Sequence, residues 1–173
     1  MSWHVMFVET GYEDDVCFYI NKIVPYMFED VKFNFLVPKR KIYEKKQGVK
    51  REVIKKLFPG YVLVDTDEIL NFYIRARGKS HIIRFLTNNH NFLEVEEHEI
   101  VKILELSNDD GLIDISKGLI VDEKIKVMEG PLTDKEGIIR KLDKRKGRAK
   151  VEFAINGHKW MIDLGVDILQ NLE

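Results

Sequence analysis

Hydrophobic positions in the first part of the chain change between the spacing of strands and the spacing of helices. Residues 3–8 form a mainly apolar run that predicts a strand, and apolar residues then recur every three or four positions as far as Pro25, which predicts a helix. Thr10 and Glu13 have the spacing of a capping box, so we expect them to start this helix. The face that we expect to be buried carries Val16, Ile20 and either Ile23 or Val24.

The same patterns predict the remaining elements of this part of the chain. Residues 33–37 and 61–64 are short apolar runs typical of buried strands, and the polar stretch between them, which contains Gly48, predicts a hairpin arm. Strands that alternate with helices in this way predict an α/β domain over residues 1–106. The other expected elements are a short helix capped by Asp65 or Thr66, a buried segment at 82–86 and an amphipathic helix over 96–106.

The pattern changes in the last third of the chain. Residues 107–117 are polar and rich in turn-forming residues, so we expect a linker there. After it, short alternating segments are separated by Gly, Pro and Asp, which predicts a small β-barrel of about five strands over residues 118–173. The segments expected to form these strands are 125–128, 137–142, 149–155, 158–163 and 166–169.

A turn signal stands directly before one of the buried strands, in the run from Phe58 to Val64. Pro59 fixes φ and lacks an N–H, and Gly60 permits positive φ, so the chain is expected to turn there and to enter a strand at Tyr61. A turn this rigid can present Phe58 and Tyr61 as a fixed hydrophobic surface. The alternative is an ordinary strand start whose aromatic side chains lie in the core.

Composition excludes several classes of protein. The chain has 173 residues, of which 45% are hydrophobic and 33% charged, which is typical of a globular protein. Its longest uncharged apolar runs are only a few residues long, so we expect neither a signal peptide nor a membrane span. The single cysteine, Cys17, cannot form an internal disulfide, and we expect a cytoplasmic protein.

The formal net charge of −1 conceals two strongly basic segments. Residues 39–56 contain nine basic and two acidic residues, and residues 135–150 contain eight basic and two acidic residues. Local excesses of this size on a nearly neutral chain favour contacts with a polyanion at defined places. A solvated polar hairpin or a turn kept polar for solubility is the alternative for each segment.

Motifs for catalysis or metal binding are absent from the sequence. Residues 77–80 imitate the end of a phosphate-binding P-loop, but Tyr73 stands where that loop needs its first glycine. The five histidines show no metal-ligand spacing with cysteine or carboxylates. We therefore expect no enzyme activity, no cofactor and no metal site.

Two motifs in the right order and at the right separation make the chain resemble the NusG family of transcription elongation factors. That family joins an α/β N-terminal domain, called NGN, to a C-terminal barrel, called KOW. The resemblance implies an α+β fold in which an antiparallel sheet with flanking helices at 1–106 is followed by a five-stranded barrel at 118–173. The residues that carry it are Trp3-His4-Val5, Gly11-Tyr12-Glu13, Val37-Pro38, Phe58 to Val64, Gly130-Pro131-Leu132 and Glu136-Gly137-Ile138-Ile139.

The resemblance also implies a binding surface for RNA polymerase. In this family a concave apolar patch on the NGN domain binds the clamp helices of polymerase and favours continued elongation. Carried over by position, the contact residues are Phe58 and Tyr61, with Phe7 and Phe85 nearby. A few aromatic side chains that lose their water on binding can supply most of an interface's free energy.

Departures from the general NusG pattern indicate a specialised paralogue. Asn156 stands where general members carry a phenylalanine that docks a ribosomal protein or Rho. Together with the basic segment 135–150 it makes the chain resemble the LoaP subgroup, antiterminators whose KOW domain binds an RNA hairpin in a nascent leader transcript. The residues expected to bind RNA are Arg140, Lys141, Lys144, Arg145, Lys146, Arg148, Lys150, His158 and Lys159.

Upstream DNA beside the polymerase is a further expected partner. No membrane partner is expected, and the chain is expected to be a monomer. The alternatives are a general NusG that couples polymerase to the ribosome or Rho, and a ribosome-associated KOW protein. The candidates for DNA contact are Lys45, Lys46, Lys50, Arg51, Arg75 and Arg77.

Overall fold

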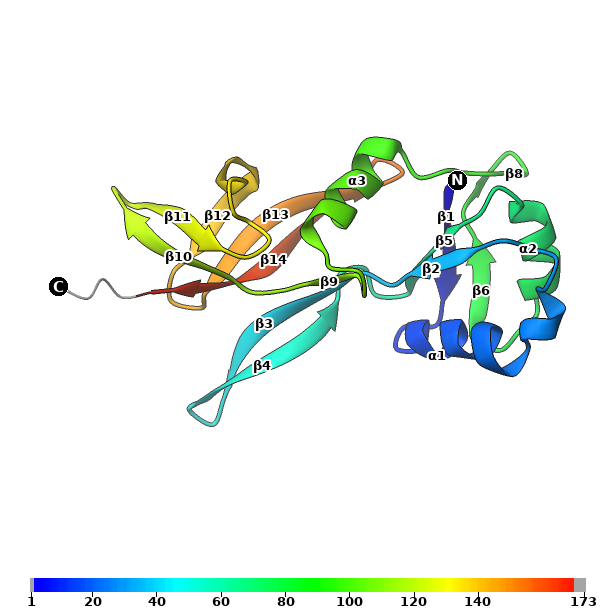
Figure 1. Ribbon diagram of the computed structural model, residues 1–173, viewed down its shortest axis with the longest axis horizontal. Helices are drawn as coiled ribbons and strands as arrows, with labels where there is room; N and C mark the ends of the chain where they lie inside the picture. The colour runs from blue at the N-terminus through cyan, green and yellow to red at the C-terminus, as the bar shows by residue number, and fades with distance from the viewer. Residues whose placement is uncertain (1, 170–173) are drawn as a thin grey trace. The chain divides into compact units, whose positions relative to one another are not determined.

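The computed structural model describes residues 2–169, which divide into two compact units (Figure 1). The first unit comprises residues up to 37 together with 58–100, and the second comprises 38–57 together with residues from 101 onward. The units are therefore not the two contiguous stretches expected from the sequence. Residues 38–57, expected to be part of the α/β domain, make their contacts with the C-terminal strands instead.

The first unit is a four-stranded antiparallel sheet in the order β2-β5-β1-β6, with helices on one face. Its main strands are β1 (Trp3–Val8), β2 (Asn34–Leu36), β5 (Tyr61–Asp65) and β6 (Ile82–Phe85), and β7 (Thr87–Asn88) pairs with β8 (Asn91–Phe92). Its helices are α1 (Glu13–Phe18), the π-helical turn η1 (Tyr19–Ile23), the 3-10 turn η2 (Pro25–Met27) and α2 (Ile69–Ala76). Helix α3 (Glu97–Leu106) crosses the boundary between the units.

The helical face of the first unit follows the predicted spacing, with one change. Val16, Ile20 and Val24 are buried, whereas Ile23 is exposed at 55%. A step of four residues from Ile20 to Val24 keeps both side chains on the sheet. Of the two residues that the sequence left open for the buried face, Val24 is buried and Ile23 is not.

The predicted capping box is wrong, because the carboxylate of Glu13 bonds elsewhere. Helix α1 begins at Glu13, with Tyr12 as its N-cap and no side-chain cap. The fully buried carboxylate accepts the N–H of Gly60 through Oε1 at 2.7 Å and the N–H of Gly11 through Oε2 at 3.1 Å. Glu13 therefore joins the start of α1 to the turn before β5.

The turn before β5 needs a glycine for two reasons. Gly60 has φ of +84°, and a Cβ there would lie 3.2 Å from both Thr10 Oγ1 and the Val8 carbonyl oxygen. That close approach allows the Gly60 carbonyl to accept the Val8 N–H at 2.8 Å. The turn is thus fastened to the end of β1 as well as to α1, which confirms the predicted turn and the strand at Tyr61.

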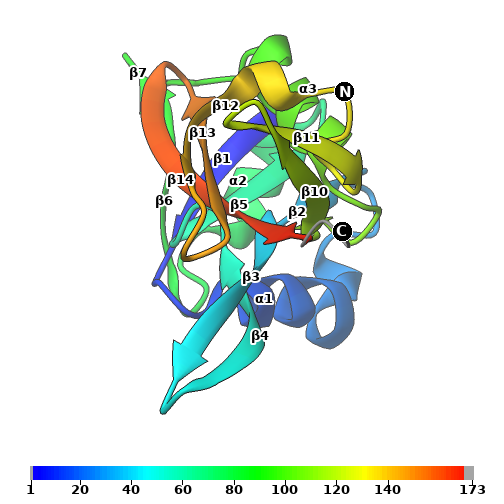
Figure 2. The ribbon, with the colours of Figure 1, turned by 90° about the vertical axis from the view of Figure 1, so that its left-hand side faces the viewer.

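The second unit contains a five-stranded sheet in the order β11-β10-β14-β13-β12, which confirms the number of C-terminal strands expected (Figure 2). We call it the C-terminal sheet. A second sheet, in the order β4-β3-β9, carries the long hairpin of β3 and β4. The strands are β3 (Lys39–Lys46), β4 (Val49–Lys56), β9 (Leu112–Ile113), β10 (Ser116–Val121), β11 (Lys124–Glu129), β12 (Ile139–Asp143), β13 (Arg148–Ile155) and β14 (His158–Ile168), with a 3-10 turn η3 (Glu136–Ile138).

Two expectations about the C-terminal part are corrected. The segment 107–117 is more than a linker, because it holds β9, which pairs in parallel with β3, and the start of β10. The segments 158–163 and 166–169 belong to one continuous strand, β14. Strand β10 was not predicted, since its first half is polar and contains Gly118.

The residues from Gly130 to Glu136 tie β10 to β11. A Cβ on Gly130, which has φ of +102°, would lie 2.7 Å from the Cα of Ser116, so only glycine fits there. The fully buried Leu132 donates its backbone N–H to Ser116 Oγ at 3.0 Å, and Glu136 Oε1 accepts the Val127 N–H at 2.8 Å. Gly130, Leu132 and Glu136 thus each hold a backbone hydrogen bond or permit a close backbone contact.

Replacing Glu13 by alanine is expected to destabilise the first unit. The buried N–H of Gly60 would lose its acceptor, which costs about 1–3 kcal/mol of unfolding free energy. Glu13→Gln should cost less, since the amide oxygen can still accept that N–H. Urea unfolding followed by circular dichroism measures the change, and Asp15→Ala, an exposed acidic residue of the same helix, is the control with an expected change below about 0.5 kcal/mol. Equal effects at both positions would contradict the assignment.

Candidate nucleic-acid interface

Three of the four aromatic residues expected to bind polymerase lie together on the sheet face opposite the helices. Phe7 and Tyr61 are register partners on β1 and β5, with ring centroids 4.7 Å apart. The Phe58 ring lies 6.1 Å from that of Tyr61. On the other side, the exposed Arg84 guanidinium lies 4.4 Å from the centroid of Phe7. Phe7 and Tyr61 are partly exposed, and burial raises the pKa of the Tyr61 hydroxyl against the opposing charge of Arg84.

Phe85 and Phe58 differ from the expectation. Phe85 pairs with Met6 and packs against Phe72 and Tyr73 in the core beneath the helices, so it lies on the other face of the sheet. Phe58 has only 1% of its surface exposed, which makes it a core aromatic that supports Tyr61. The expectation that the turn exposes Phe58 is therefore wrong, whereas Phe7 and Tyr61 remain accessible.

In the second unit, the β3–β4 hairpin lies against β14 at a position where β14 has no side chain. A Cβ on Gly165 would lie 2.5 Å from the carbonyl oxygen of Lys41 and 3.3 Å from the Cα of Ile42. Contacts below 3.0 Å with backbone atoms cannot be relieved by a side-chain movement. Glycine at this position therefore permits the two backbones to approach.

Two arginines fasten the hairpin beside this contact. Arg40 Nη1 donates to the Asp163 carbonyl at 2.7 Å, and Arg148 Nη2 donates to the Tyr43 carbonyl. Burial lowers the pKa of Arg40 despite the nearby charge of Asp163. Arg148, expected to bind RNA, thus has a structural role through one nitrogen, although its side chain also borders the cleft described next.

A cleft of about 800 Å³ lies between the hairpin and the turn that joins β12 to β13. Both basic segments of the sequence contribute to it. Its walls carry six basic and three acidic side chains, so its net charge is positive. The lining residues are Tyr43, Glu44, Lys45, Lys50, Lys144, Arg145, Lys146, Gly147, Arg148, Asp163, Val166, Asp167 and Ile168.

Four of the basic side chains in the cleft form no ion pair with another described residue. Within residues 2–169, the structure shows no ion pair or hydrogen bond from the side chains of these four exposed residues. Lys50 differs, since its ammonium lies 3.1 Å from Asp167 Oδ1 and 3.8 Å from the centre of the Tyr43 ring. Unpaired cations in a concave surface attract an anionic ligand strongly. The four are Lys45, Lys144, Arg145 and Lys146.

The turn between β12 and β13 has a fixed shape. Asp143 Oδ1 accepts the Lys146 N–H at 2.9 Å, and this bond, helped by the charges of Lys146 and Arg145, lowers the pKa of Asp143. Gly147, with φ of +63°, accepts the Val166 N–H at 3.0 Å and leaves no room for a Cβ, which would lie 2.5 Å from the Val166 carbonyl oxygen. The turn therefore packs on β14, as the hairpin does.

The remaining residues expected to bind RNA lie outside the cleft. Arg140 and Lys141 are exposed on β12, and Lys150 pairs with Asp163 at 2.9 Å. Lys159 lies 3.5 Å from Glu152, and the ring of His158 lies 4.3 Å from that of Trp160. None of these residues lines the cleft.

His158 and Lys159 lie at the wrong end of the sheet to join the cleft. Strand β13 separates their turn from the turn at 144–147, and its eight residues span roughly 23 Å at about 3.3 Å per residue. His158 and Lys159, expected to bind RNA, therefore do not lie beside the basic turn, because successive hairpin turns in an antiparallel sheet alternate ends. The turn itself follows from Asn156 and Gly157, both with positive φ, as a two-residue hairpin requires.

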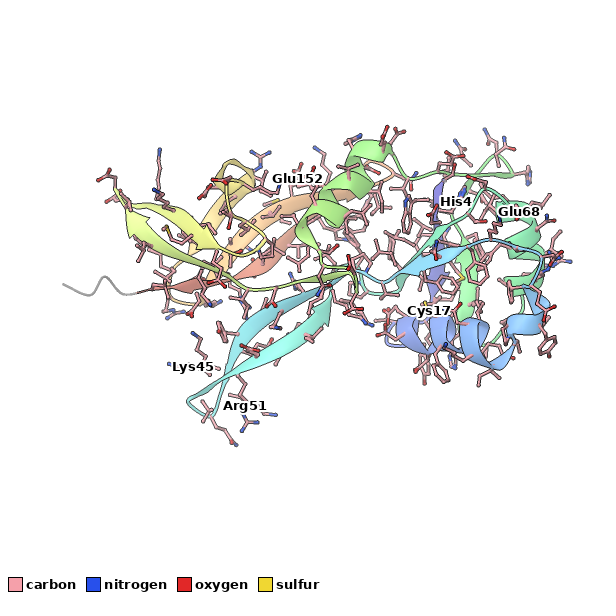
Figure 3. All side chains as sticks on the ribbon, in the orientation of Figure 1. His4, Cys17, Lys45, Arg51, Glu68 and Glu152 are labelled. Carbon is pink, nitrogen blue, oxygen red and sulfur yellow. The ribbon has the colours of Figure 1, made fainter. Side chains whose placement is uncertain are left out.

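The candidates for DNA contact are divided among several surfaces. Lys45 and Lys50 are register partners on the hairpin and both line the cleft. Lys46 and Arg51 are their neighbours on the two strands and lie on the opposite face, and Figure 3 shows Lys45 and Arg51 leaving the hairpin on different sides. Arg75 donates to Asp30 Oδ2 at 2.5 Å. Arg77 lies 5.9 Å from the Tyr73 ring centre.

Tyr43 is an aromatic cleft residue that sequence reasoning missed, as it missed the acidic and apolar residues of the lining. Its ring forms part of the wall and lies under the ammonium group of Lys50. Alternation along β3 places it on the same face as Lys45, two residues on, which was a signal available in the sequence. An aromatic ring beside unpaired cations can stack on a base while the cations contact phosphates.

Together, the two units define a protein with an accessible aromatic surface and a cationic cleft. An α/β unit with an accessible aromatic pair is joined to a small β unit with a cationic cleft, which is the chemistry of polyanion binding. Within residues 2–169, no group of three or more potential metal ligands is present, and none of the helices has the length and apolarity to span a membrane.

Comparison with known proteins then identifies the family. A family model described as "Transcription termination factor nusG" matches residues 1–104, and the chain belongs to the NusG family. The transcription termination/antitermination protein NusG of Bacillus subtilis is 30% identical over 94% of this chain and 94% of its own length. The protein of the same name from Thermus thermophilus is 26% identical over 95% of both chains. A structure described as "Domain interaction in Thermotoga maritima NusG" has a TM-score of 0.54 at 23% identity, over 95% of this chain and 93% of that chain, and shows the same fold.

Replacing Gly165 by alanine is expected to push the hairpin away from β14. Forcing a methyl group against the Lys41 carbonyl should lower the unfolding free energy of the second unit by about 1–3 kcal/mol. Gly137→Ala is the matched control, because no atom lies within 4 Å of a Cβ there and its φ is not positive. Thermal unfolding compares the two variants. Similar melting temperatures for both would show that the hairpin does not depend on this contact.

Proposed function

We propose that this protein is a transcription elongation and antitermination factor of the LoaP type. In this proposal the α/β part, assigned as an NGN domain over residues 1–106, binds RNA polymerase at its clamp helices. The barrel, assigned as a KOW domain over residues 118–173 after a connecting segment at 107–117, binds an RNA hairpin in a nascent leader transcript. Membership in the NusG family and relatives named as termination/antitermination proteins support the general role in transcription.

The observation that carries the RNA-binding proposal is the set of cations without an ion-pair partner at the β12–β13 turn. Lys144, Arg145 and Lys146 project from one end of the C-terminal sheet, and none has an ion-pair partner among the described residues. Phosphate groups of folded RNA would supply the missing negative charge, and guanidinium groups can also pair with exposed base edges.

Loss of the ribosome and Rho contacts is supported by the turn between β13 and β14. Asn156 adopts φ of +48° there and Gly157 +76°, a conformation that favours Asn-Gly and disfavours a bulky aromatic residue. The phenylalanine knob expected of general family members is therefore replaced by a tight turn. A role that depends on RNA instead of on those partners fits this surface.

Polymerase binding is assigned to Phe7 and Tyr61, with Phe58 as the buried support. Their edge-to-face rings and the adjacent Arg84 form an amphipathic surface on the face of the sheet away from the helices. An apolar patch with one cationic neighbour suits a helical partner that presents both apolar and acidic side chains. Phe85 has no part in this surface, because it lies in the core.

The RNA-binding proposal predicts that Arg145→Gln/Lys146→Gln weakens binding to a leader RNA hairpin about tenfold or more. Two lost phosphate contacts should also lower the slope of log K against log salt by about 2. Gel shifts at several salt concentrations measure both quantities. The control is Lys124→Gln/Lys126→Gln, which removes two exposed charges from β11 outside the cleft. Unchanged affinity in the first variant, with the fold intact, would refute RNA binding at this turn.

The polymerase proposal predicts that Tyr61→Ala abolishes retention of core RNA polymerase in a pull-down, because one of the two accessible aromatic rings is removed. Tyr26→Ala should retain polymerase, since Tyr26 is 67% exposed on η2, away from this surface. Equal retention by both variants would assign the contact elsewhere. Failure of the wild-type chain to retain polymerase would favour a ribosome-associated role.

A further inference from the structure

We propose that the β3–β4 hairpin is the second wall of the RNA site, and that the cleft between it and the β12–β13 turn receives the single-stranded loop of an RNA hairpin. This inference rests on the proposed function of the second unit as an RNA-binding domain. It adds a binding surface outside the C-terminal sheet and specifies which part of the RNA enters.

The hairpin is held well enough to serve as a wall. Its backbone meets β14 at Gly165, Arg40 donates to the Asp163 carbonyl, and Lys41 pairs with Asp114 at 3.0 Å. On the other wall, Arg148 reaches across to the Tyr43 carbonyl. Since these bonds exist without ligand, an RNA that enters the cleft does not have to order either wall.

Three side chains on one face of the hairpin line the cleft, together with the adjacent Glu44. Tyr43 and Lys45 alternate onto the cleft face of β3, and Lys50 joins them from β4. Lys46, which is the next residue after Lys45, does not line the cleft. The chain therefore offers two adjacent lysines of equal charge and similar exposure, of which one faces the site.

The size and chemistry of the cleft favour a loop over a duplex. A volume of about 800 Å³ is that of a pocket for a small ligand, which admits a few nucleotides but not a double helix. Lys45 and Arg145 on opposite walls can contact phosphates on either side of an unstacked base. The ring of Tyr43 lies under the Lys50 ammonium at 3.8 Å from the ring centre, and a base that stacks on this face would take the place of that ammonium. Sequence-specific RNA recognition generally uses such splayed, single-stranded bases.

The direct test compares Lys45→Gln with Lys46→Gln in the full chain. The probes are a fluorescently labelled RNA hairpin with a single-stranded loop, the same stem as a blunt RNA duplex, and a DNA hairpin of the same sequence. Lys45→Gln is expected to weaken binding to the RNA hairpin about 3- to 10-fold and to lower the salt slope by about 1, as the loss of one phosphate contact should. Lys46→Gln is expected to leave both unchanged.

A third variant tests the role of the ring. Tyr43→Leu keeps an apolar side chain and leaves the backbone carbonyl that Arg148 uses. Tyr43→Leu is expected to weaken binding of the RNA hairpin that has the loop and to leave binding of the blunt RNA duplex unchanged. Equal losses on both RNAs would overturn the loop assignment. Stronger binding of the DNA hairpin than of the RNA hairpin, with the same dependence on Lys45, would overturn the assignment to RNA.

The outcomes separate this inference from the proposed function. If Arg145→Gln/Lys146→Gln leaves RNA affinity unchanged, RNA binding by the turn fails as a whole. If that variant weakens binding while Lys45→Gln and Lys46→Gln behave alike, the turn binds RNA without the hairpin and the two-walled site is refuted. Thermal unfolding of each variant establishes that the fold is intact, so a change in affinity reports on the contact itself.

Discussion

The close approach of two backbones at Gly165 positions the β3–β4 hairpin in the second unit. Because β14 has no side chain at this point, the carbonyl of Lys41 lies where a Cβ would otherwise stand, and β3 packs directly on β14. Arg40 and Arg148 then bond carbonyl groups across the seam. These two arginines hold the hairpin in place, and five lysine and arginine side chains besides Arg148 line the cleft between hairpin and turn. The hairpin thus belongs to the C-terminal strands, although it is inserted in sequence between strands of the first unit.

A single contact also organises the first unit, where a buried carboxylate holds two segments together by hydrogen bonds. Glu13 accepts the N–H of Gly60 and so holds the turn before β5 against the start of α1. The position of that turn sets where Tyr61 enters the sheet, next to Phe7 on the face away from the helices. The accessible aromatic pair therefore depends on a hydrogen bond to a residue that takes no part in it.

Much of the fold could be predicted from the sequence, because alternation and helical spacing depend only on which face is buried. Strand β1, the turn at Pro59 and Gly60, and four of the five strands of the C-terminal sheet were expected on that basis, whereas β10 was not. Contacts between distant segments could not be predicted in this way. The spacing of Glu13 predicted a local capping box, whereas its carboxylate accepts the N–H of Gly60. Phe58 was expected at the surface, whereas it is buried. Nothing in the sequence distinguishes Arg148 from the neighbouring cations, because its bond to the Tyr43 carbonyl depends on the folded hairpin. The position of His158 and Lys159 could have been deduced from the sequence, since β13 lies between their turn and the basic turn at 144–147.

The central claim is that hairpin and turn bind the same RNA. Ultraviolet crosslinking of a bound RNA hairpin to the full chain, followed by mass spectrometry of the peptides, tests it most directly. The account predicts crosslinks from loop nucleotides to the peptide that contains Tyr43 and to the peptide that contains the 144–147 turn. Crosslinks confined to the turn, or to stem nucleotides, would contradict a two-walled site for the loop.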